Sequence, residues 1–526
     1  MRKYFPMLRL PYVFIIVMLA GCMTAQNNTP AKRTSGTTLT ANEPHRPQIH
    51  FTPKEKWMND PNGLVYSKGV YHLFYQYYPD STVWGPMHWG HATTKDLFHW
   101  QEEPIALYPD SLGYIFSGSA VVDVANTSGF GKKGQVPLVA IFTHHDPKGE
   151  KAGTNDFQYQ SIAYSLDEGK TWTKYAGNPV VKNPGIRDFR DPKVMWHEET
   201  KKWIMTLATL DRVTFFSSPN LKDWTKESEF GEKVGAHGGV WECPDLFPLN
   251  HNGESIWILL VSINPGGPNG GSATQYFTGK FDGHQFTPLA TDTRWIDYGP
   301  DNYAGVTWAN TGKRKIFLGW MSNWQYATVV PTEKWRSAMT VPRDLGLEKA
   351  GEKFLLLSTP SPEIKTLENK VTTINNLRVE NFDLTGRTGK LNGPVRLDMT
   401  ADKLVSFFIT LSNSKGQKVV LGFDKQTNNY FIDRTASGKV AFEKGFAAKH
   451  SAPRLTTNET VDFTLLIDNA SVELFADKGL TAMTQIFFPD ENFTDIAIQS
   501  RDNFTLKSLR FATLKSIHKS NAMAAQ

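Results

Sequence analysis

The stretch Trp57-Met58-Asn59-Asp60-Pro61-Asn62-Gly63 decides the local fold. Asn-Asp-Pro-Asn-Gly favours a turn, because proline fixes its own φ, Asn and Gly tolerate positive φ, and Asn and Asp side chains bond to nearby backbone. Two runs of strand-forming residues follow, at 64–66 and 70–75. We therefore expect a turn leading into a two-stranded hairpin, which would hold the carboxyl group of Asp60 rigidly beside the ring of Trp57.

The composition indicates a chain of several β-rich domains. At 526 residues it exceeds one ordinary domain. Aromatic residues make up 12% of the chain, and its 41 Gly and 30 Pro favour many short strands joined by turns. The net charge is only +5 and the basic residues are scattered, which argues against a nucleic-acid partner. The two cysteines, Cys22 and Cys243, provide no disulfide framework.

The N-terminal segment resembles a bacterial lipoprotein signal peptide, which we assign to residues 1–22. A basic start is followed by an apolar run and by Leu19-Ala20-Gly21-Cys22, which resembles the lipoprotein cleavage box. The resemblance implies lipidation of Cys22 and a place in the bacterial cell envelope, periplasmic or on the outer surface. The only membrane contact would be the lipid anchor. A plain secretory signal that ends in cysteine is the alternative. Residues 23–45 are polar and predict a flexible tether.

Residues 46–350 show the pattern of a repeated all-β domain. Strand-like runs occur at 136–142, 202–207 and 256–261. A weak repeat recurs at Asp96 to Trp100, Asp167 to Trp172, Leu221 to Trp224 and, more loosely, at Phe286. A propeller blade takes about 40–50 residues. The region therefore predicts a β-propeller of five or six blades.

A second β domain is expected after a linker. Residues 351–368 contain two prolines and predict the linker. Residues 369–517 alternate in the manner of a two-sheet β-sandwich. Residues 518–526 are expected to form a frayed tail.

Three acids stand in unusual contexts. Asp60 lies in the opening stretch, Asp191 in Phe189-Arg190-Asp191-Pro192-Lys193, and Glu242 in Trp241-Glu242-Cys243-Pro244-Asp245. Their spacing places each in a different blade. The innermost strands of a propeller converge on one axis, so acids from separate blades can meet there. Taken singly, each acid also has an ordinary structural explanation.

These three acid-bearing motifs resemble motifs of glycoside hydrolase family 32. Two further stretches share the resemblance, Trp84-Gly85-Pro86-Met87-His88-Trp89-Gly90-His91 and Phe116-Ser117-Gly118-Ser119. This family comprises the β-fructosidases: invertases, inulinases and levanases. The resemblance covers about residues 46–515. It implies a five-bladed β-propeller followed by a C-terminal β-sandwich. It also implies retaining hydrolysis that releases terminal β-D-fructofuranosyl units from fructans (levan or inulin) and from sucrose.

The resemblance assigns a role to each acid. Asp60 would be the nucleophile, Glu242 the general acid/base and Asp191 the transition-state stabiliser. Retaining hydrolysis needs two carboxyl groups about 5–5.5 Å apart. We expect backbone N–H groups of the turn to keep Asp60 ionised and Arg190 to hold Asp191 by a charge-assisted bond. No metal and no cofactor are required.

Other matching residues are expected to line the substrate pocket, with aromatic faces for sugar C–H groups and polar side chains for hydroxyls. They are Trp57, Met58, Asn59, Gln76, Trp84, Phe116, Ser117, Arg190, Asp301 and Trp320. Alternatives on the same scaffold are an endo-levanase, a sucrose-preferring invertase, or a surface glycan-binding lipoprotein that has lost catalysis. The last alternative predicts loss of at least one of the three acids, and all three are present.

Overall fold

The computed structural model describes residues 43–132 and 134–518. The predicted signal peptide and lipidation site Cys22 lie outside these residues, as do most of the tether and of the tail. No helix within the described ranges is long and apolar enough to cross a membrane.

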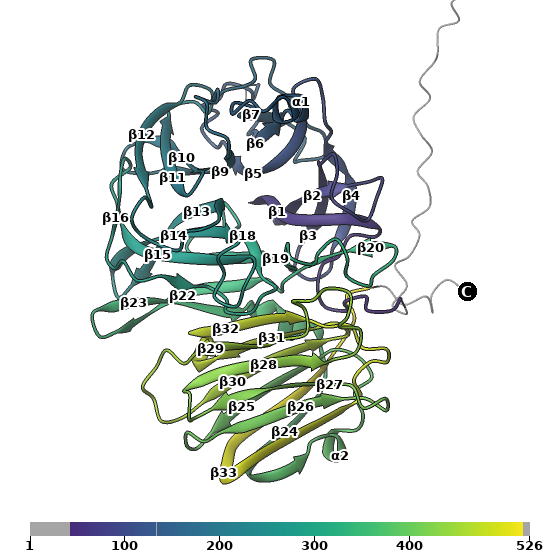
Figure 1. The fold of residues 1–526 in the computed structure, drawn as a ribbon. Coiled ribbons are helices and arrows are strands. Elements are labelled where there is room, and N and C mark those ends of the chain that lie inside the picture. The colour runs from purple at the N-terminus through teal and green to yellow at the C-terminus, as the bar shows by residue number, and fades with distance from the viewer. Residues whose placement is uncertain (1–42, 133, 519–526) are drawn as a thin grey trace, which may run out of the picture. The chain divides into compact units, whose positions relative to one another are not determined.

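Five small sheets are arranged in a ring and form the blades of a propeller (Figure 1). Blade 1 holds β1 (Lys56–Ser67), β2 (Val70–Tyr78), β3 (His88–Thr94) and β4 (Gln101–Leu107), with β20 (Trp335–Arg336) beside β1. Blade 2 holds β5 (Tyr114–Val122), β6 (Leu138–His145), β7 (Gln158–Ser165) and β8 (Thr173–Lys174), with α1 (Pro147–Ala152) after β6. The five-bladed propeller is therefore confirmed.

The remaining blades follow the same antiparallel order. Blade 3 holds β9 (Phe189–His197), β10 (Lys202–Thr209), β11 (Arg212–Ser218) and β12 (Thr225–Phe230). Blade 4 holds β13 (Val240–His251), β14 (Glu254–Asn264), β15 (Ala273–Phe281), β16 (Phe286–Pro288) and β17 (Arg294–Trp295). Blade 5 holds β18 (Tyr303–Thr307), β19 (Ile316–Met321), β21 (Ala338–Met339), β22 (Arg343–Ala350) and β23 (Lys353–Pro360).

The weak sequence repeat marks one position in successive blades. Its copies at 96–100, 167–172 and 221–224 lie between the third and fourth strands of blades 1, 2 and 3, and Phe286 begins the fourth strand of blade 4. Trp172 and Trp224 each donate an indole N–H bond to a carbonyl of their own turn, on Gly169 and Leu221. The repeat is thus a turn that closes each blade onto its outer strand.

The opening stretch is not the turn that its composition favours. Residues 57–63 lie within β1, and the hairpin turns only at Lys68-Gly69. The register of β1 against β2 shifts between Met58 and Pro61 and again before Val65. Pairing with β2 keeps the turn-forming residues within β1 as bulges. Asp60 therefore lies where the regular hydrogen bonding between β1 and β2 is interrupted.

The predicted linker also differs from the structure. Strand β23 pairs with β22 along its whole length, so the propeller extends to Pro360 rather than to residue 350. The connection shrinks to the 3-10 helix η1 (Pro362–Leu367).

The C-terminal region forms a β-sandwich, as predicted. Its strands are β24 (Glu368–Asp383), β25 (Val395–Ala401), β26 (Phe407–Ser412), β27 (Lys418–Asp424), β28 (Asn429–Ala436), β29 (Lys449–Pro453), β30 (Asp462–Asp468), β31 (Ser471–Ala476), β32 (Thr481–Ile486) and β33 (Asp495–Leu514). The short helices α2 (Thr385–Thr388) and η2 (Asp477–Gly479) interrupt them. Long β33 joins the two layers, because its first part pairs with β26 and its last part with β25. One apolar core lies between the layers.

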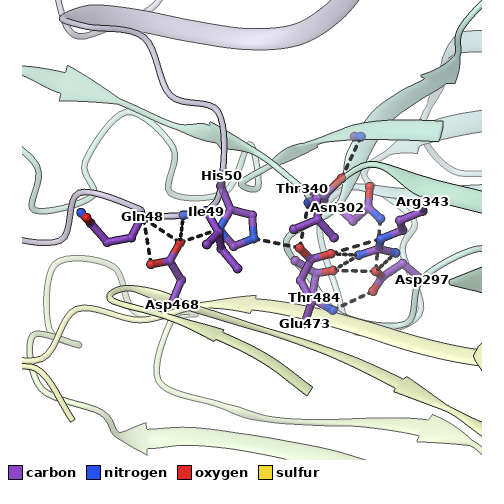
Figure 2. Close-up of polar contacts among 12 residues, drawn as sticks. Gln48, Ile49, His50, Asp297, Asn302, Thr340, Arg343, Asp468, Glu473 and Thr484 are labelled. Carbon is purple, nitrogen blue, oxygen red and sulfur yellow. Dashed lines mark hydrogen bonds and ion pairs between the residues drawn. The ribbon is translucent and has the colours of Figure 1, made fainter. Parts of the chain in front are cut away.

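Buried charges join the sandwich to the propeller (Figure 2). The ring of His50 lies between two sandwich carboxylates, 2.8 Å from Asp468 Oδ2 and 2.9 Å from Glu473 Oε1. Arg343 donates to Asp297 at 2.8 Å and also bonds to Glu473. Removing one partner from such a network leaves an uncompensated buried charge, so loss of any member is expected to destabilise this contact.

Candidate active site

A pocket of about 280 Å³ opens at the beginnings of the inner strands β1, β5, β9 and β13. It brings together Asp60, Asp191 and Glu242 from three blades. Of the other residues expected there, the lining contains Asn59, Gln76, Trp84, Phe116, Ser117 and Arg190. The acids therefore share one cavity at the axis of the ring, where separate blades can each supply one.

A local irregularity of the inner strands aims these side chains. At the level of the pocket, the inner strand of each blade contains one residue more than the second strand that pairs with it. The extra residues lie between Met58 and Pro61, Ile115 and Gly118, Arg190 and Lys193, Glu242 and Asp245, and Tyr303 and Val306. Asp191 and Cys243 have positive φ values of 66° and 45°. Such bulges turn side chains out of the regular alternation of a strand. They direct the acids of three strands into the same cavity.

The carboxylate of Asp60 is held by side chains. Ser117 Oγ donates to Oδ2 at 2.7 Å, and the amide of Asn59 donates to Oδ1 at 3.0 Å. Trp57 in turn donates its indole N–H to the amide oxygen of Asn59 at 2.8 Å. The expected backbone N–H donors are not among its bonds within the described chain, because the segment is a bulged strand rather than a turn.

Asp191 and Asp60 share one neighbour, the thiol of Cys243. Oδ2 of Asp191 accepts a bond from the backbone N–H of Cys243 at 3.0 Å. The thiol of Cys243 lies 3.6 Å from Oδ2 of both Asp60 and Asp191. The two carboxylates therefore contact the same sulfur atom.

Glu242 is fixed through both of its oxygens. Arg190 donates to Oε1 from Nε at 3.2 Å and from Nη2 at 2.9 Å, and the hydroxyl of Tyr303 donates to Oε2. The expected bond from Arg190 to Asp191 is wrong. The guanidinium of Arg190 is instead occupied by Glu242 and by Asp188, to which Nη1 donates at 2.5 Å.

Burial and mutual repulsion set the charges in the pocket. Burial, followed by the charge of Glu242, raises the pKa of Asp60 above its usual value, while the bonds from Ser117 and Asn59 oppose that rise. Burial also raises the pKa of Asp191; Arg190 opposes this, and the charges of Glu242 and Asp60 add to it. Three close carboxylates cannot all ionise freely. The site can therefore hold a proton near neutral pH, as acid/base chemistry requires.

The rim of the pocket is aromatic. Trp84 is 40% exposed and meets Phe116 edge to face, with ring centroids 6.0 Å apart. Gln76 is buried and donates to the carbonyl of Ile115 at 3.0 Å. A flat exposed ring above fixed polar groups suits a sugar, which has apolar C–H faces and hydroxyl edges.

Four residues expected in the pocket are placed outside its lining. Trp57, Met58 and Trp320 are fully buried, and the ring of Trp57 stacks on Trp324 at 5.9 Å. These three side chains belong to the apolar core behind the pocket wall, because large apolar side chains near the axis also fill the cores of the blades.

The expectation that Asp301 lines the pocket is wrong. Asp301 pairs instead with Arg434 of the sandwich at 2.8 Å and accepts bonds from the Tyr326 hydroxyl at 2.5 Å and from the Ile486 N–H at 3.0 Å. Its partner Arg434 lies far along the chain, so no local pattern indicates this contact.

The sequence prediction missed several lining residues. They are His145, Glu150, Phe157, Gln158, Arg187, Asp188 and Trp324. The charged run Arg187-Asp188-Phe189-Arg190-Asp191 was a usable signal, because charged residues are rare in buried strands. The segment around α1 carries no comparable signal. Tyr303, whose hydroxyl bonds to Glu242, was not predicted as a site residue, although it lies only two residues after Asp301.

Metal ligands are not assembled in this pocket. Within residues 43–132 and 134–518, no group of three or more His, Cys, Asp or Glu side chains has the arrangement of a metal site. The paired His144 and His145 separate: His144 bonds to Ser161 and His145 to Glu150. The chemistry that these residues support is acid/base and nucleophilic.

Comparisons with known proteins agree with this geometry. Residues 50–360 match the family described as "Glycosyl hydrolases family 32 N-terminal domain", and residues 362–515 match "Glycosyl hydrolases family 32 C terminal". The chain is 45% identical over 491 residues to a levanase of Bacillus subtilis (strain 168), with 90% of this chain and 71% of the levanase covered.

Two solved structures are also similar. An exo-inulinase of Aspergillus awamori has 37% identity and a TM-score of 0.83, with 90% of this chain and 99% of that chain covered. A β-fructofuranosidase of Schwanniomyces occidentalis, solved with fructosyl-erythritol, has 34% identity and a TM-score of 0.82. That match covers 91% of this chain and 99% of the other.

Proposed function

The chain belongs to glycoside hydrolase family 32, and from this membership we propose that it is a retaining β-fructosidase acting on fructans. It removes terminal β-D-fructofuranosyl units from levan or inulin and also cleaves sucrose. The single observation that carries the proposal is the meeting of Asp60, Asp191 and Glu242 in one axial pocket. Relatives named levanase and exo-inulinase support the substrate class.

Asp60 is the proposed nucleophile. Its carboxylate attacks the anomeric C2 of the terminal fructosyl unit, forms a covalent ester with that carbon and expels the glycosidic oxygen. The bonds from Ser117 and Asn59 favour the ionised form and keep one orientation toward the substrate.

Glu242 is the proposed general acid and then base. In the first step its carboxyl proton passes to the departing oxygen, and in the second step its carboxylate takes a proton from the water that attacks C2. That attack breaks the ester bond to Asp60 and releases fructose with retained configuration. Arg190 and Tyr303 fix the direction in which the proton is delivered.

Asp191 is the proposed stabiliser of the transition state. Its carboxylate accepts hydrogen bonds from fructose hydroxyls, which strengthen as positive charge develops on the sugar ring. The backbone N–H of Cys243 keeps this carboxylate in place.

The size of the pocket supports removal of terminal units. At about 280 Å³ it is near the lower end of the range for ligand pockets, about 300–1,000 Å³. That space suits one terminal sugar unit better than a stretch of an uninterrupted chain. The competing endo-levanase, sucrose-preferring invertase and non-catalytic binding protein differ in their products.

A time course with product sizing separates these candidates. Purified protein is incubated with levan, inulin and sucrose, and early products are sized by chromatography. The proposal predicts fructose as the product from the first minutes, with faster release from a fructan than from sucrose. Early oligosaccharides would indicate endo action. Absence of products from all three substrates would leave only a binding protein.

We also propose that the mature protein is a lipid-anchored protein of the bacterial cell envelope. Support comes from the Leu19-Ala20-Gly21-Cys22 sequence after a basic and apolar segment. An anchor would retain the enzyme where polymeric substrate reaches the cell.

A further inference from the structure

A larger cavity lies at the other ends of the inner strands. Its volume is about 920 Å³, and it is lined by residues near the ends of β5, β9, β13 and β18. The catalytic pocket uses the beginnings of β5, β9 and β13, and these strands face the centre of the ring (Figure 1). The protein therefore has a second opening toward its axis, distinct from the pocket that holds the three acids.

One residue of the cavity lining, Asp245, has a buried carboxylate with an unused oxygen. Asp245 Oδ2 accepts bonds from the N–H and hydroxyl of Thr307, at 2.6 and 2.7 Å, and lies 3.2 Å from Lys193 Nζ. Oδ1 of the same carboxylate is buried and lacks a hydrogen-bond partner within the described chain. A buried acceptor without a donor is costly, so this atom calls for a donor from whatever fills the cavity.

A half-buried ammonium group lies in the same wall. Lys315 lines the cavity, and within the described ranges its side chain has no hydrogen bond or ion pair. Burial lowers its pKa, and the charge of Asp245 opposes that shift. Among the described residues, the cavity thus presents an acceptor without a donor, Asp245 Oδ1, and a donor without an acceptor, Lys315 Nζ.

Part of the cavity lining is aromatic. Trp257 and Trp196 are both partly exposed, and the indole of Trp257 packs against Phe281, with centroids 5.3 Å apart. Trp196 is held by a bond from its indole N–H to Glu198 at 2.7 Å. Such rings offer rigid apolar faces beside the polar centre.

From this combination we infer that the cavity is a second carbohydrate-binding site, for a neutral sugar with adjacent hydroxyl groups. One hydroxyl donates to Asp245 Oδ1, its neighbour accepts from Lys315 Nζ, and the C–H face of the ring lies against tryptophan. An anion fits less well, because the free carboxylate oxygen would repel it. The fructosyl unit of the substrate or product is the sugar expected there, and this identification rests on the proposed function.

Counting bound sugars tests the inference. Native mass spectrometry of the intact protein at increasing D-fructose concentration is expected to show two specific sites, one in each cavity. Lys315→Met keeps the apolar stem of lysine and removes its donor. It should weaken the second site about tenfold or more and leave hydrolysis of sucrose unchanged. Lys313→Met is the matched control, because Lys313 is an exposed lysine two residues away, and it should behave as the wild type.

A crystal of the wild-type protein soaked in D-fructose keeps the test decisive if Lys315→Met does not fold. Sugar density between Asp245 and Lys315 supports the inference. Binding of a single fructose, two equal sites in Lys315→Met, or inorganic phosphate in place of fructose would each overturn it. Failure to hydrolyse fructans would refute the proposed function and is read out separately, by product release.

Discussion

Arg190 donates two hydrogen bonds to one oxygen of Glu242, from Nε at 3.2 Å and from Nη2 at 2.9 Å. The two residues come from neighbouring blades, β9 and β13. The guanidinium is itself held by Asp188 at 2.5 Å. The two bonds that converge on Oε1 fix the position of that oxygen, and the bond from the Tyr303 hydroxyl to Oε2 fixes the plane of the carboxylate. The acid/base group is therefore oriented by a residue from another blade.

Arg190→Lys tests this orientation. Lysine keeps the positive charge but lacks the rigid guanidinium that places two donors on Oε1 and a third on Asp188, so the carboxyl of Glu242 would be held less firmly. We expect kcat to fall about 10²-fold on natural substrates, with less loss on fructosides that have good leaving groups. Steady-state kinetics measure both values. Arg212→Lys, at a surface ion pair of blade 3, is the control, and an equal loss on both substrate types would contradict the role of Arg190.

Ser117→Ala should move the acid side of the pH–activity profile. Activity requires ionised Asp60 and is lost as the pH falls through its pKa, which burial and Glu242 already raise. Removing the 2.7 Å bond from Ser117 withdraws a contact that favours the ionised form, so the pKa rises further. The acid limb of kcat/KM should shift upward by about one pH unit. The profile should not move in Ser165→Ala, because Ser165 ends strand β7 and its hydroxyl bonds to Asp167 outside the pocket.

The buried charged contact between propeller and sandwich, centred on His50, should contribute less to stability at alkaline pH. Burial opposes a charge on His50, but the bonds and charges of Asp468 and Glu473 overcome it and raise the pKa to about 9. The stabilisation is then fully present below the unfolded value near 6.5 and is lost as the pH rises through about 9. Thermal unfolding followed from pH 6 to 10, a range set by these values, should show this loss.

His50→Gln should remove that pH dependence while lowering stability by about 3–5 kcal/mol, because buried carboxylates lose their cation. His99→Gln removes an exposed histidine that pairs with Asp96 and should leave the unfolding curve nearly unchanged. An alkaline loss that persists in His50→Gln would place the titrating group elsewhere.

Cys22→Ala tests the lipid anchor. Phase separation of cell extracts in a cloud-point detergent should place the wild-type protein in the detergent phase. The variant, without the thiol that would be acylated, should stay uncleaved or move to the aqueous phase. Hydrolytic activity of solubilised protein should be the same in both. A wild-type protein found only in the aqueous phase would indicate a plain secretory signal.

The sequence predicted the blades and the three acids because both depend on short-range patterns. Turn residues recur between the third and fourth strands of the blades, and each acid lies beside a proline or a proline-containing motif at the start of an inner strand. The bulges at these points were not predicted. Their residues, such as 59–62, have turn propensity, and only pairing with β2 decides that they stay in a strand.

Partners distant in the chain account for the other differences. Asp301 forms an ion pair with Arg434 instead of lining the pocket. Arg190 bonds to Glu242, 52 residues away, instead of to Asp191. Trp320 is buried by packing against Trp57 and Trp324. In each case tertiary contacts select among orientations that the local sequence leaves equally accessible.

Trapping the covalent intermediate tests the central claim most directly. Glu242→Gln lacks both the acid and the base, so a fructoside with a good leaving group can still fructosylate the enzyme while the second step is blocked. After a rapid quench and proteolysis, mass spectrometry should find one added fructosyl unit on the peptide that contains Asp60, and none in the Asp60→Asn, Glu242→Gln double variant. An adduct on another residue, or turnover without any adduct, would contradict double displacement at Asp60.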